Sequence, residues 1–384
     1  MSKAIYFLGG ARRGGGQGGQ YVYRYHEEDG SLELRSINYP EMSVGQQCYD
    51  ADRNISYVVE EIDNQRGAVG GGGYVWALRF LREQEKLELI NYRPSMASMP
   101  AYVCIDKSKR FAVVVHHGLK HHVTRVVQDP DGSYRTEVIF EEGTIVVFRL
   151  NQEGGFEEAT DVITIPGDQK PGMRTFCHPH WVGTDPTGEL YLVTDCGSDR
   201  IFTFHLDRER GKLIPLTTTV VGYGYWPRYA VFHPTLPVFY DSNEMKPVVQ
   251  GYRYDVQTGN IEMFCEQGML TEEFKNGVEQ HCEPTDILMH PNAKHLYAAL
   301  RAYNSIAVYD LDDSGAFTLK QVISCGGETP RGLCIAPTGK HLYSLNRDEP
   351  NIAGFAIAED GSLTSLGTIQ DHCISSMVSV TFDT

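Results

Sequence analysis

The stretch HPHWVGTDPTGELYLVTDCGSDRIFTFHLD, residues 178–207, decides the fold. Two runs of alternating apolar residues lie on either side of a Pro-Thr-Gly turn, and a third run follows a second turn. Period-two alternation bounded by turn residues is typical of β-strands, whereas no helical periodicity is sustained. The segment therefore predicts three consecutive strands joined by short turns.

The same pattern recurs along the chain. Further copies are found at residues 226–255, 283–315, 329–361 and 99–118, with weaker ones from Gly45 and from Ser375. A repeat of about 40 to 50 residues with three or four strands is typical of a propeller blade. Seven copies predict an all-β, seven-bladed β-propeller in which residues 1–384 form a single domain.

The two ends of the chain look like parts of one blade. The copy from Ser375 supplies one strand only, and the N-terminal strands KAIYFLGG and QYVYRYHEEDGSLELR lack a preceding partner. Joining them would close the ring and remove the exposed edges that an open sheet leaves. We therefore expect the last blade to be closed by strands from both termini. Residues 118–143 interrupt the repeat and are predicted to be an insert.

Blade geometry predicts which side chains meet. The innermost strand of a blade starts at one rim of the central channel, and the second strand returns to that rim. Arg228 begins the first strand of its copy and Glu244 ends the second, so both are expected at one mouth. The same reasoning adds His178 and His180 with Asp195, Arg331 with Asn346 and Arg347, Tyr102 with His116, and Asp286 with Arg301.

Composition narrows the possible partners. The chain has 50 acidic and 34 basic residues, a net charge of −16, so nucleic acid and anionic membranes are unlikely partners. No segment is apolar for long enough to be a signal peptide or a membrane span. The nine cysteines include no C-x-x-C pair and are expected to be reduced thiols. We expect a cytoplasmic protein.

Three of these segments resemble a known family. HPHWVGTDPTG (178–188), PRYAVFHP (227–234) with SNE (242–244), and TPRGLCIAPTGKHLYSLNRD (329–348) resemble blades of the seven-bladed propeller lactonases, whose members open or close different lactone rings. The resemblance implies an active site in the central cleft. At the matching positions, the catalytic residues are expected to be Glu244, His180, Arg228 and Arg301, and the substrate-binding residues Arg331, His178 and Asn346.

These residue types suit ring opening. Hydrolysis of a lactone needs a polarised carbonyl and a water activated by a general base. Glu244 is the candidate base, His180 can carry the complementary proton, and arginines suit a carboxylate or phosphate on the substrate. The chain is thus predicted to be a lactonase for an anionic sugar lactone such as 6-phosphogluconolactone, working without a metal or cofactor. The alternatives are a lactone-forming cycloisomerase acting on an unsaturated dicarboxylate, or a non-catalytic binding scaffold.

Three other motifs carry less weight. HHGLKHH (116–122) and CHPH (177–180) contain zinc-binding residue types without a standard spacing, so we expect loop histidines and no bound metal. Gly14–Gly19 spells a formal G-x-G-x-x-G, but a strand follows it where a dinucleotide site needs a helix. Arg12 and Arg13, just before this loop, are candidates to lie over the cleft.

Overall fold

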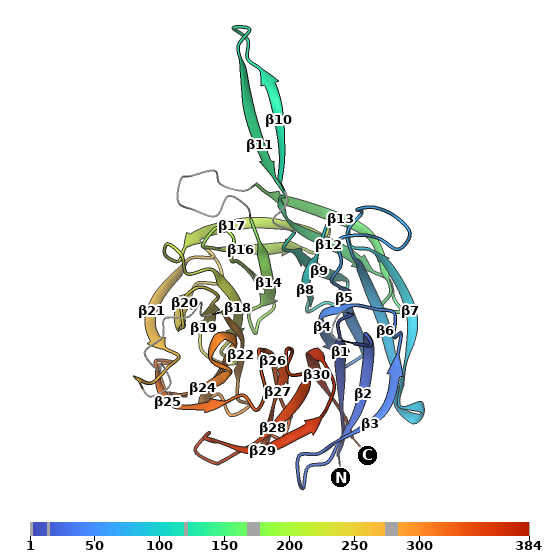
Figure 1. Cartoon of the computed structure of the whole chain (residues 1–384), viewed down its shortest axis with the longest axis vertical. Helices are drawn as coiled ribbons and strands as arrows, with labels where there is room; N and C mark the ends of the chain where they lie inside the picture. The colour runs from blue at the N-terminus through green and yellow to red at the C-terminus, as the bar shows by residue number, and fades with distance from the viewer. Residues whose placement is uncertain (1–2, 14–15, 119–121, 167–176, 273–282, 384) are drawn as a thin grey trace.

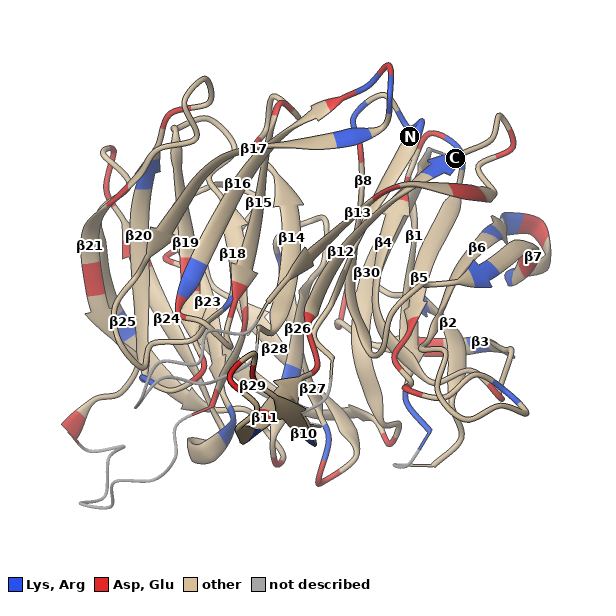
Figure 2. Ribbon diagram, turned by 90° about the horizontal axis from the view of Figure 1, so that it is seen from above, with Lys and Arg blue, Asp and Glu red and all other residues tan. Residues whose placement is uncertain are grey.

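The computed structural model describes residues 3–13, 16–118, 122–166, 177–272 and 283–383. These residues form seven four-stranded antiparallel sheets set around a central axis (Figure 1), and the strands run between the two faces of the disc (Figure 2). The prediction of an all-β, seven-bladed propeller is confirmed.

Each blade has an inner, a second, a third and an outer strand. The inner strands are β4 (Val44–Asp50), β8 (Pro100–Ile105), β14 (Pro179–Thr184), β18 (Pro227–Phe232), β22 (Pro284–Met289), β26 (Pro330–Ile335) and β30 (Ile374–Asp383). The second strands, in the same order of blades, are β5 (Ile55–Glu60), β9 (Phe111–His116), β15 (Leu190–Asp195), β19 (Val238–Asn243), β23 (His295–Leu300), β27 (His341–Asn346) and β1 (Lys3–Ala11).

The outer half of each blade follows the same order. The third strands are β6 (Tyr74–Leu81), β12 (Gly143–Leu150), β16 (Arg200–Asp207), β20 (Val248–Tyr254), β24 (Ser305–Leu311), β28 (Asn351–Ile357) and β2 (Gly19–Tyr25). The outer strands are β7 (Lys86–Pro94), β13 (Phe156–Ile165), β17 (Lys212–Val220), β21 (Ile261–Gly268), β25 (Phe317–Ser324), β29 (Leu363–Gln370) and β3 (Leu32–Asn38). The structure also contains two 3₁₀ turns, η1 (Arg82–Gln84) and η2 (Arg301–Tyr303).

The core lies between neighbouring blades. All residues of β5, β9, β15, β19, β23 and β27 are buried, because each second strand is covered by a neighbouring sheet on both faces. Outer strands such as β7 and β29 carry mostly exposed or half-buried residues. The buried second strands therefore hold the blade ends rigidly, which suits them to position a site.

The ring closes through the two ends of the chain. β30 pairs antiparallel with β1, from Lys3 opposite Asp383 to Ala11 opposite Ile374. Both chain ends lie at the same face of the disc in Figure 2. The expected closure of the last blade by strands from both termini is confirmed.

A separate hairpin occupies most of the segment 118–143. β10 (His122–Gln128) and β11 (Tyr134–Phe140) pair only with each other and project outward from the rim of the disc (Figure 1). The hairpin therefore points away from the central axis.

The eight cysteines of the described residues are free thiols. Among these residues we find no helix whose length and apolar character would let it cross a membrane.

Candidate active site

The inner strands share an irregularity at their first residues. In β14, β18 and β26 the pairing with the second strand shifts directly after the first proline, so His180, Arg228 and Arg331 are extra residues in the ladder. Such β-bulges redirect a side chain and are common beside active sites. The prolines thus mark three positions whose side chains are turned relative to the regular strand.

The residue after each second strand lies beside this bulge. The backbone N–H of Glu244 donates to the carbonyl of Trp226 at 2.8 Å, and that of Arg301 donates to Glu283 at 3.2 Å. The same bond recurs in four more blades, and the residues that occupy the position are Glu61, His117, Cys196, Glu244, Arg301 and Arg347. The fold therefore brings residues far apart in sequence to one mouth of the channel.

This register corrects the predicted position of Asp195 and one predicted pair, and it adds other residues. Beside the bulge of β14 lies Cys196, whereas Asp195 lies opposite Pro179 and accepts from the N–H groups of His178 and Gly197. In the blade of β8 and β9, the residue beside the bulge is His117 and the bulged residue is Ala101, so the expected pair of Tyr102 and His116 is wrong by one position. His116 is fully buried inside its blade. Glu61 was not anticipated at all, although the weak copy from Gly45 places it at the position of Glu244.

The ion pair between Arg228 and Glu244 is the centre of the site. Arg228 Nε lies 3.1 Å from Glu244 Oε2, and only 4% and 18% of the two side chains are exposed. The guanidinium carbon of Arg228 is 4.8 Å from the Tyr229 ring centre, and the Tyr229 hydroxyl accepts a hydrogen bond from Gln46 Nε2 at 3.0 Å. Burial opposes the charge of Arg228, but attraction by Tyr229 and Glu244 leaves its pKa above the ordinary value.

Three imidazole rings adjoin this ion pair. The His180 ring lies 5.0 Å from the Tyr229 ring and is parallel to the His117 ring at 5.7 Å, and the His178 ring lies 4.4 Å from His117. Burial and the nearby Arg228 hold the pKa of His180 well below its ordinary value. Burial and Arg12 lower the pKa of His117 to about 4. Both rings are therefore neutral at pH 7.

Arginines crowd the same mouth. Arg301 Nε lies 3.3 Å from Glu283 Oε2, and burial together with repulsion by Arg228 lowers the pKa of Arg301 to about 9. Arg331 Nη2 lies 3.4 Å from Glu61 Oε2, and burial is the main cause that lowers its pKa to about 10. Arg12 also pairs with Glu61. The local excess of positive charge contrasts with the negative charge of the whole chain.

Several buried nitrogen atoms of the site lack a protein partner. Within the described part of the chain, Arg228 Nη1, Arg331 Nε and His180 Nδ1 form no hydrogen bond. A buried polar group without a partner costs about 1–3 kcal/mol, so such groups are rare in the absence of a function. The three atoms are therefore available to hydrogen-bond a ligand.

Asn346 has a different environment from the other predicted binding residues. Its amide nitrogen donates to Cys325 O at 3.2 Å and Asn351 Oδ1 at 2.7 Å, and its oxygen accepts from the Ser344 hydroxyl at 3.0 Å. These bonds hold the side chain inside its blade. The geometry thus supports a structural role for Asn346, and Arg347 takes the place beside the bulge.

The histidine motifs do not form a metal centre in the described residues, among which no group of three or more His, Cys, Asp or Glu side chains has ligand geometry. Both ring nitrogens of His117 face acceptor oxygens, Glu61 Oε1 at 3.0 Å and Gly118 O at 2.7 Å, and the neutral ring donates to one of them. His122 is exposed at the base of the hairpin, whereas His116 is buried. Residues 119–121 of the motif lie outside the described residues.

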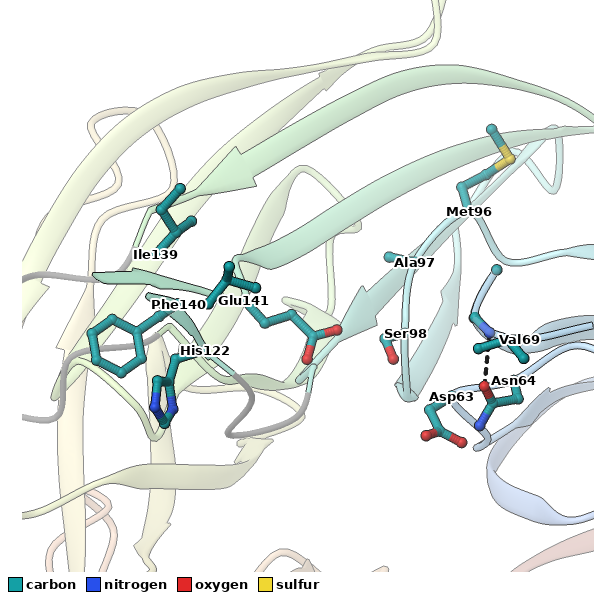
Figure 3. Close-up of a pocket in the computed structure, with 14 residues that line it drawn as sticks. Asp63, Asn64, Val69, Met96, Ala97, Ser98, His122, Ile139, Phe140 and Glu141 are labelled. Atoms are coloured by element: carbon teal, nitrogen blue, oxygen red, sulfur yellow. Dashed lines mark hydrogen bonds between the residues drawn. The ribbon is translucent and has the colours of Figure 1, made fainter. Parts of the chain in front are cut away.

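A cavity of about 670 Å³ lies outside the mouth, between the hairpin and the loop after β5 (Figure 3). Its lining includes the apolar Val123 and Ile139, and its charged side chains include the acidic Asp63 and Glu141. No arginine or lysine is among its described lining residues. This cavity therefore does not suit an anionic ligand, in contrast to the mouth that carries Arg228.

Comparison with known proteins identifies the family of this chain. The model of the family "Lactonase, 7-bladed beta-propeller" matches residues 6–382, so the chain belongs to that family of enzymes. The 6-phosphogluconolactonase of Bacillus subtilis is 21% identical over 86% of this chain and 84% of its own length. That of Formosa agariphila is 24% identical over 83% and 82%. The predicted family and enzyme class are thereby confirmed.

Solved structures show the same fold. A periplasmic gluconolactonase of Pseudomonas aeruginosa superposes with a TM-score of 0.83, covers 99% of both chains and is 18% identical. A candidate 6-phosphogluconolactonase of Bacteroides fragilis gives a TM-score of 0.81 at 24% identity, with 98% of both chains covered. At these identities the likeness establishes the propeller fold alone.

Proposed function

We propose that this protein hydrolyses an anionic sugar lactone of the 6-phosphogluconolactone kind at the mouth that carries Arg228 and Glu244. The observation that carries the proposal is the convergence of buried arginines whose N–H donors, at Arg228 Nη1 and Arg331 Nε, have no partner in the described chain. Guanidinium groups bind carboxylate and phosphate oxygens through charge-assisted hydrogen bonds. The family membership and the names of the relatives support the same reaction class.

Glu244 is the proposed general base. Arg228 orients its carboxylate at 3.1 Å, and the 18% exposure of the side chain lets water reach it. Glu244 takes a proton from this water, whose oxygen then attacks the lactone carbonyl carbon. Arg228 Nη1 is the proposed donor to the oxyanion that forms, which is the charge that such a preorganised donor stabilises best.

His180 is the proposed proton relay. Its ring is neutral at pH 7 because its pKa is held low, and its Nδ1 is buried without a partner in the described residues. As the bond between the carbonyl carbon and the ring oxygen breaks, one nitrogen of His180 releases its proton to the departing oxygen and the other takes a proton from solvent water, while Glu244 gives its proton back to solvent. Positive charge for this reaction is supplied by Arg228 and Arg301, so the proposal requires no metal.

The cytoplasmic location of the protein stays a prediction.

A pH-stat assay with three compounds tests the proposed function. We expect hydrolysis of 6-phosphogluconolactone above its spontaneous rate, slower hydrolysis of glucono-1,5-lactone, and no turnover of 3-carboxy-cis,cis-muconate. Lactone formation from the muconate would replace the proposal with a cycloisomerase. Rates no higher than the spontaneous ones for both lactones, measured with folded protein, would reject it.

A further inference from the structure

A cavity at the mouth holds Arg331 together with three arginines that have no role in the proposed reaction. It measures about 490 Å³, a volume sufficient for a small ligand. It lies between the blade of β26–β29 and the blade closed by β1 and β30. The lining residues that matter here are Arg12, Arg13, Arg331, Arg347, Asp348 and Cys373.

The cavity carries an excess of positive charge. Asp348 pairs with Arg347, with Oδ1 at 2.7 Å from Nε and Oδ2 at 2.9 Å from Nη2. Glu61 pairs with Arg12 and lies 3.4 Å from Arg331. Two carboxylates thus face four guanidinium groups, those of Arg12, Arg13, Arg331 and Arg347, and two positive charges are left over.

The other titratable group of the cavity does not cancel this excess. Burial raises the pKa of the Cys373 thiol, so the thiol is neutral at pH 7. The chain therefore leaves the two excess charges to be balanced by an anion from outside.

The cavity is also built to donate hydrogen bonds. Arg331 is only 7% exposed, and its Nε has no partner in the described chain. Arg12 Nε is likewise buried without a partner there. Burial and repulsion by Arg331 hold the pKa of Arg12 well below its ordinary value. An anion in the cavity would relieve this repulsion and complete both sets of hydrogen bonds.

We propose that this cavity is a subsite for the phosphate monoester of the substrate, separate from the centre formed by Glu244 and His180. A phosphate monoester is close to a dianion at pH 7 and carries its charge on one compact group, which matches two excess charges in one cavity. Arg331 links the two places, since it lines the cavity and contacts Glu61, which is bonded to His117 beside His180. The inference rests on the proposed function for the lactone half of the ligand.

Binding of a stable product analogue tests the subsite directly. Isothermal titration should show 6-phosphogluconate binding more tightly than gluconate to the wild-type protein, with inorganic phosphate competing against the former. Arg347→Ala should weaken 6-phosphogluconate binding by about tenfold to a hundredfold, the usual contribution of a charge-assisted hydrogen bond. Asp348→Asn should instead tighten the binding of 6-phosphogluconate, because the substitution removes a carboxylate charge that competes with the ligand for Arg347.

Arg210→Ala is the matched control. Arg210 is 78% exposed in the turn between β16 and β17, at the opposite face of the disc, and its loss should leave binding unchanged. Equal affinity for gluconate and 6-phosphogluconate, or equal weakening by Arg347→Ala and Arg210→Ala, would overturn the subsite. Citrate competing more strongly than inorganic phosphate would assign the cavity to a carboxylate and overturn it as well.

Kinetics separate a failure of the subsite from a failure of the proposed function. Arg347→Ala should lower the ratio of kcat/KM for 6-phosphogluconolactone to that for glucono-1,5-lactone by about tenfold or more. An unchanged ratio with active enzyme would reject the subsite while the lactonase stands. The expected binding pattern with no lactonase activity would reject the lactonase while the subsite stands.

Discussion

The two ends of the inner strands differ in whether the protein itself completes the hydrogen bonds of the buried polar groups compared below. At the end away from the mouth, Asp185 accepts backbone N–H bonds from Thr187, Glu189 and Leu190 at 2.9–3.0 Å. In the next blade, Asp106 is used in the same way by its own turn. At the mouth, Arg228 keeps a buried nitrogen without a partner in the described chain.

This difference teaches how structure and function divide in a repeated fold. Burial alone does not mark a functional residue, because Asp185 is 2% exposed and Arg228 is 3% exposed. The distinction is whether the chain itself completes the hydrogen bonds of the group. The completed bonds of Asp185 and Asp106 stabilise their own turns, and the unpaired nitrogen of Arg228 is available to a substrate.

The largest effect is expected from removing the proposed base. Glu244→Gln should lower kcat by about 10²- to 10⁴-fold, the usual contribution of general base catalysis, and leave the melting temperature within a few degrees. A pH-stat assay with 6-phosphogluconolactone measures the rate. The control is Glu189→Gln, a 56% exposed carboxylate in the turn at the opposite end, which should keep wild-type activity. Equal losses in both variants would remove the contrast between the two ends.

The next effect concerns the end that completes its own bonds. Asp185→Ala should lower the free energy of unfolding by about 2–4 kcal/mol, because it leaves several backbone N–H groups of a tight turn unpaired. Urea unfolding measures the loss, and kcat/KM per folded molecule should not change. A tenfold drop in kcat/KM at full folding would show that the two ends are coupled.

A pH effect should distinguish the mouth histidines. Unfolded histidine binds a proton near pH 6.5, but His117 in the fold does so only near a pKa of about 4. The free energy of unfolding should therefore fall as the pH drops from about 6.5 to about 4, by at most about 1.4 kcal/mol per pH unit for this residue, and then level off. Urea unfolding at several pH values should show a flatter slope for His117→Gln. His26→Gln, at a 42% exposed side chain, should keep the wild-type slope.

The smallest effect is expected at a mouth residue whose polar atom already has a partner within the protein. Tyr229→Phe removes the hydroxyl that accepts from Gln46, and it should lower the free energy of unfolding by about 1 kcal/mol. The value of kcat/KM should stay within about threefold of wild type. A loss of a hundredfold or more would mean that this hydroxyl acts on the substrate.

The fold can be predicted from the sequence because each blade is specified by a local pattern of strand and turn residues. Alternating apolar residues and a Pro-Thr-Gly or similar turn recur in several copies, and each copy supports the others. His180, Arg228 and Arg331 were placed correctly at the mouth because each directly follows a proline that begins an inner strand. Their catalytic and binding roles remain predictions.

The remaining site residues depend on features that leave no local pattern. The shift after Pro100 moves the mouth position from His116 to His117, and a bulge cannot be read from alternation alone. Glu61 follows the second strand β5, and the inner strand of its blade, β4, begins with Val44, so no proline marks this mouth position in the sequence. Glu61 pairs with both Arg12 and Arg331, and these three residues, which are far apart in the sequence, meet only when the ring closes.

The junction where β30 pairs with β1 couples the closure of the ring to ligand binding in the cavity beside it. Arg12 and Arg13 follow β1 and Cys373 precedes β30, while Arg331 and Arg347 belong to the adjoining blade. A ligand bound to these arginines would connect the two blades across their junction and stabilise it. Amide hydrogen exchange along β30 would then slow when phosphate is present, and opening of the ring at this junction would compete with anion capture.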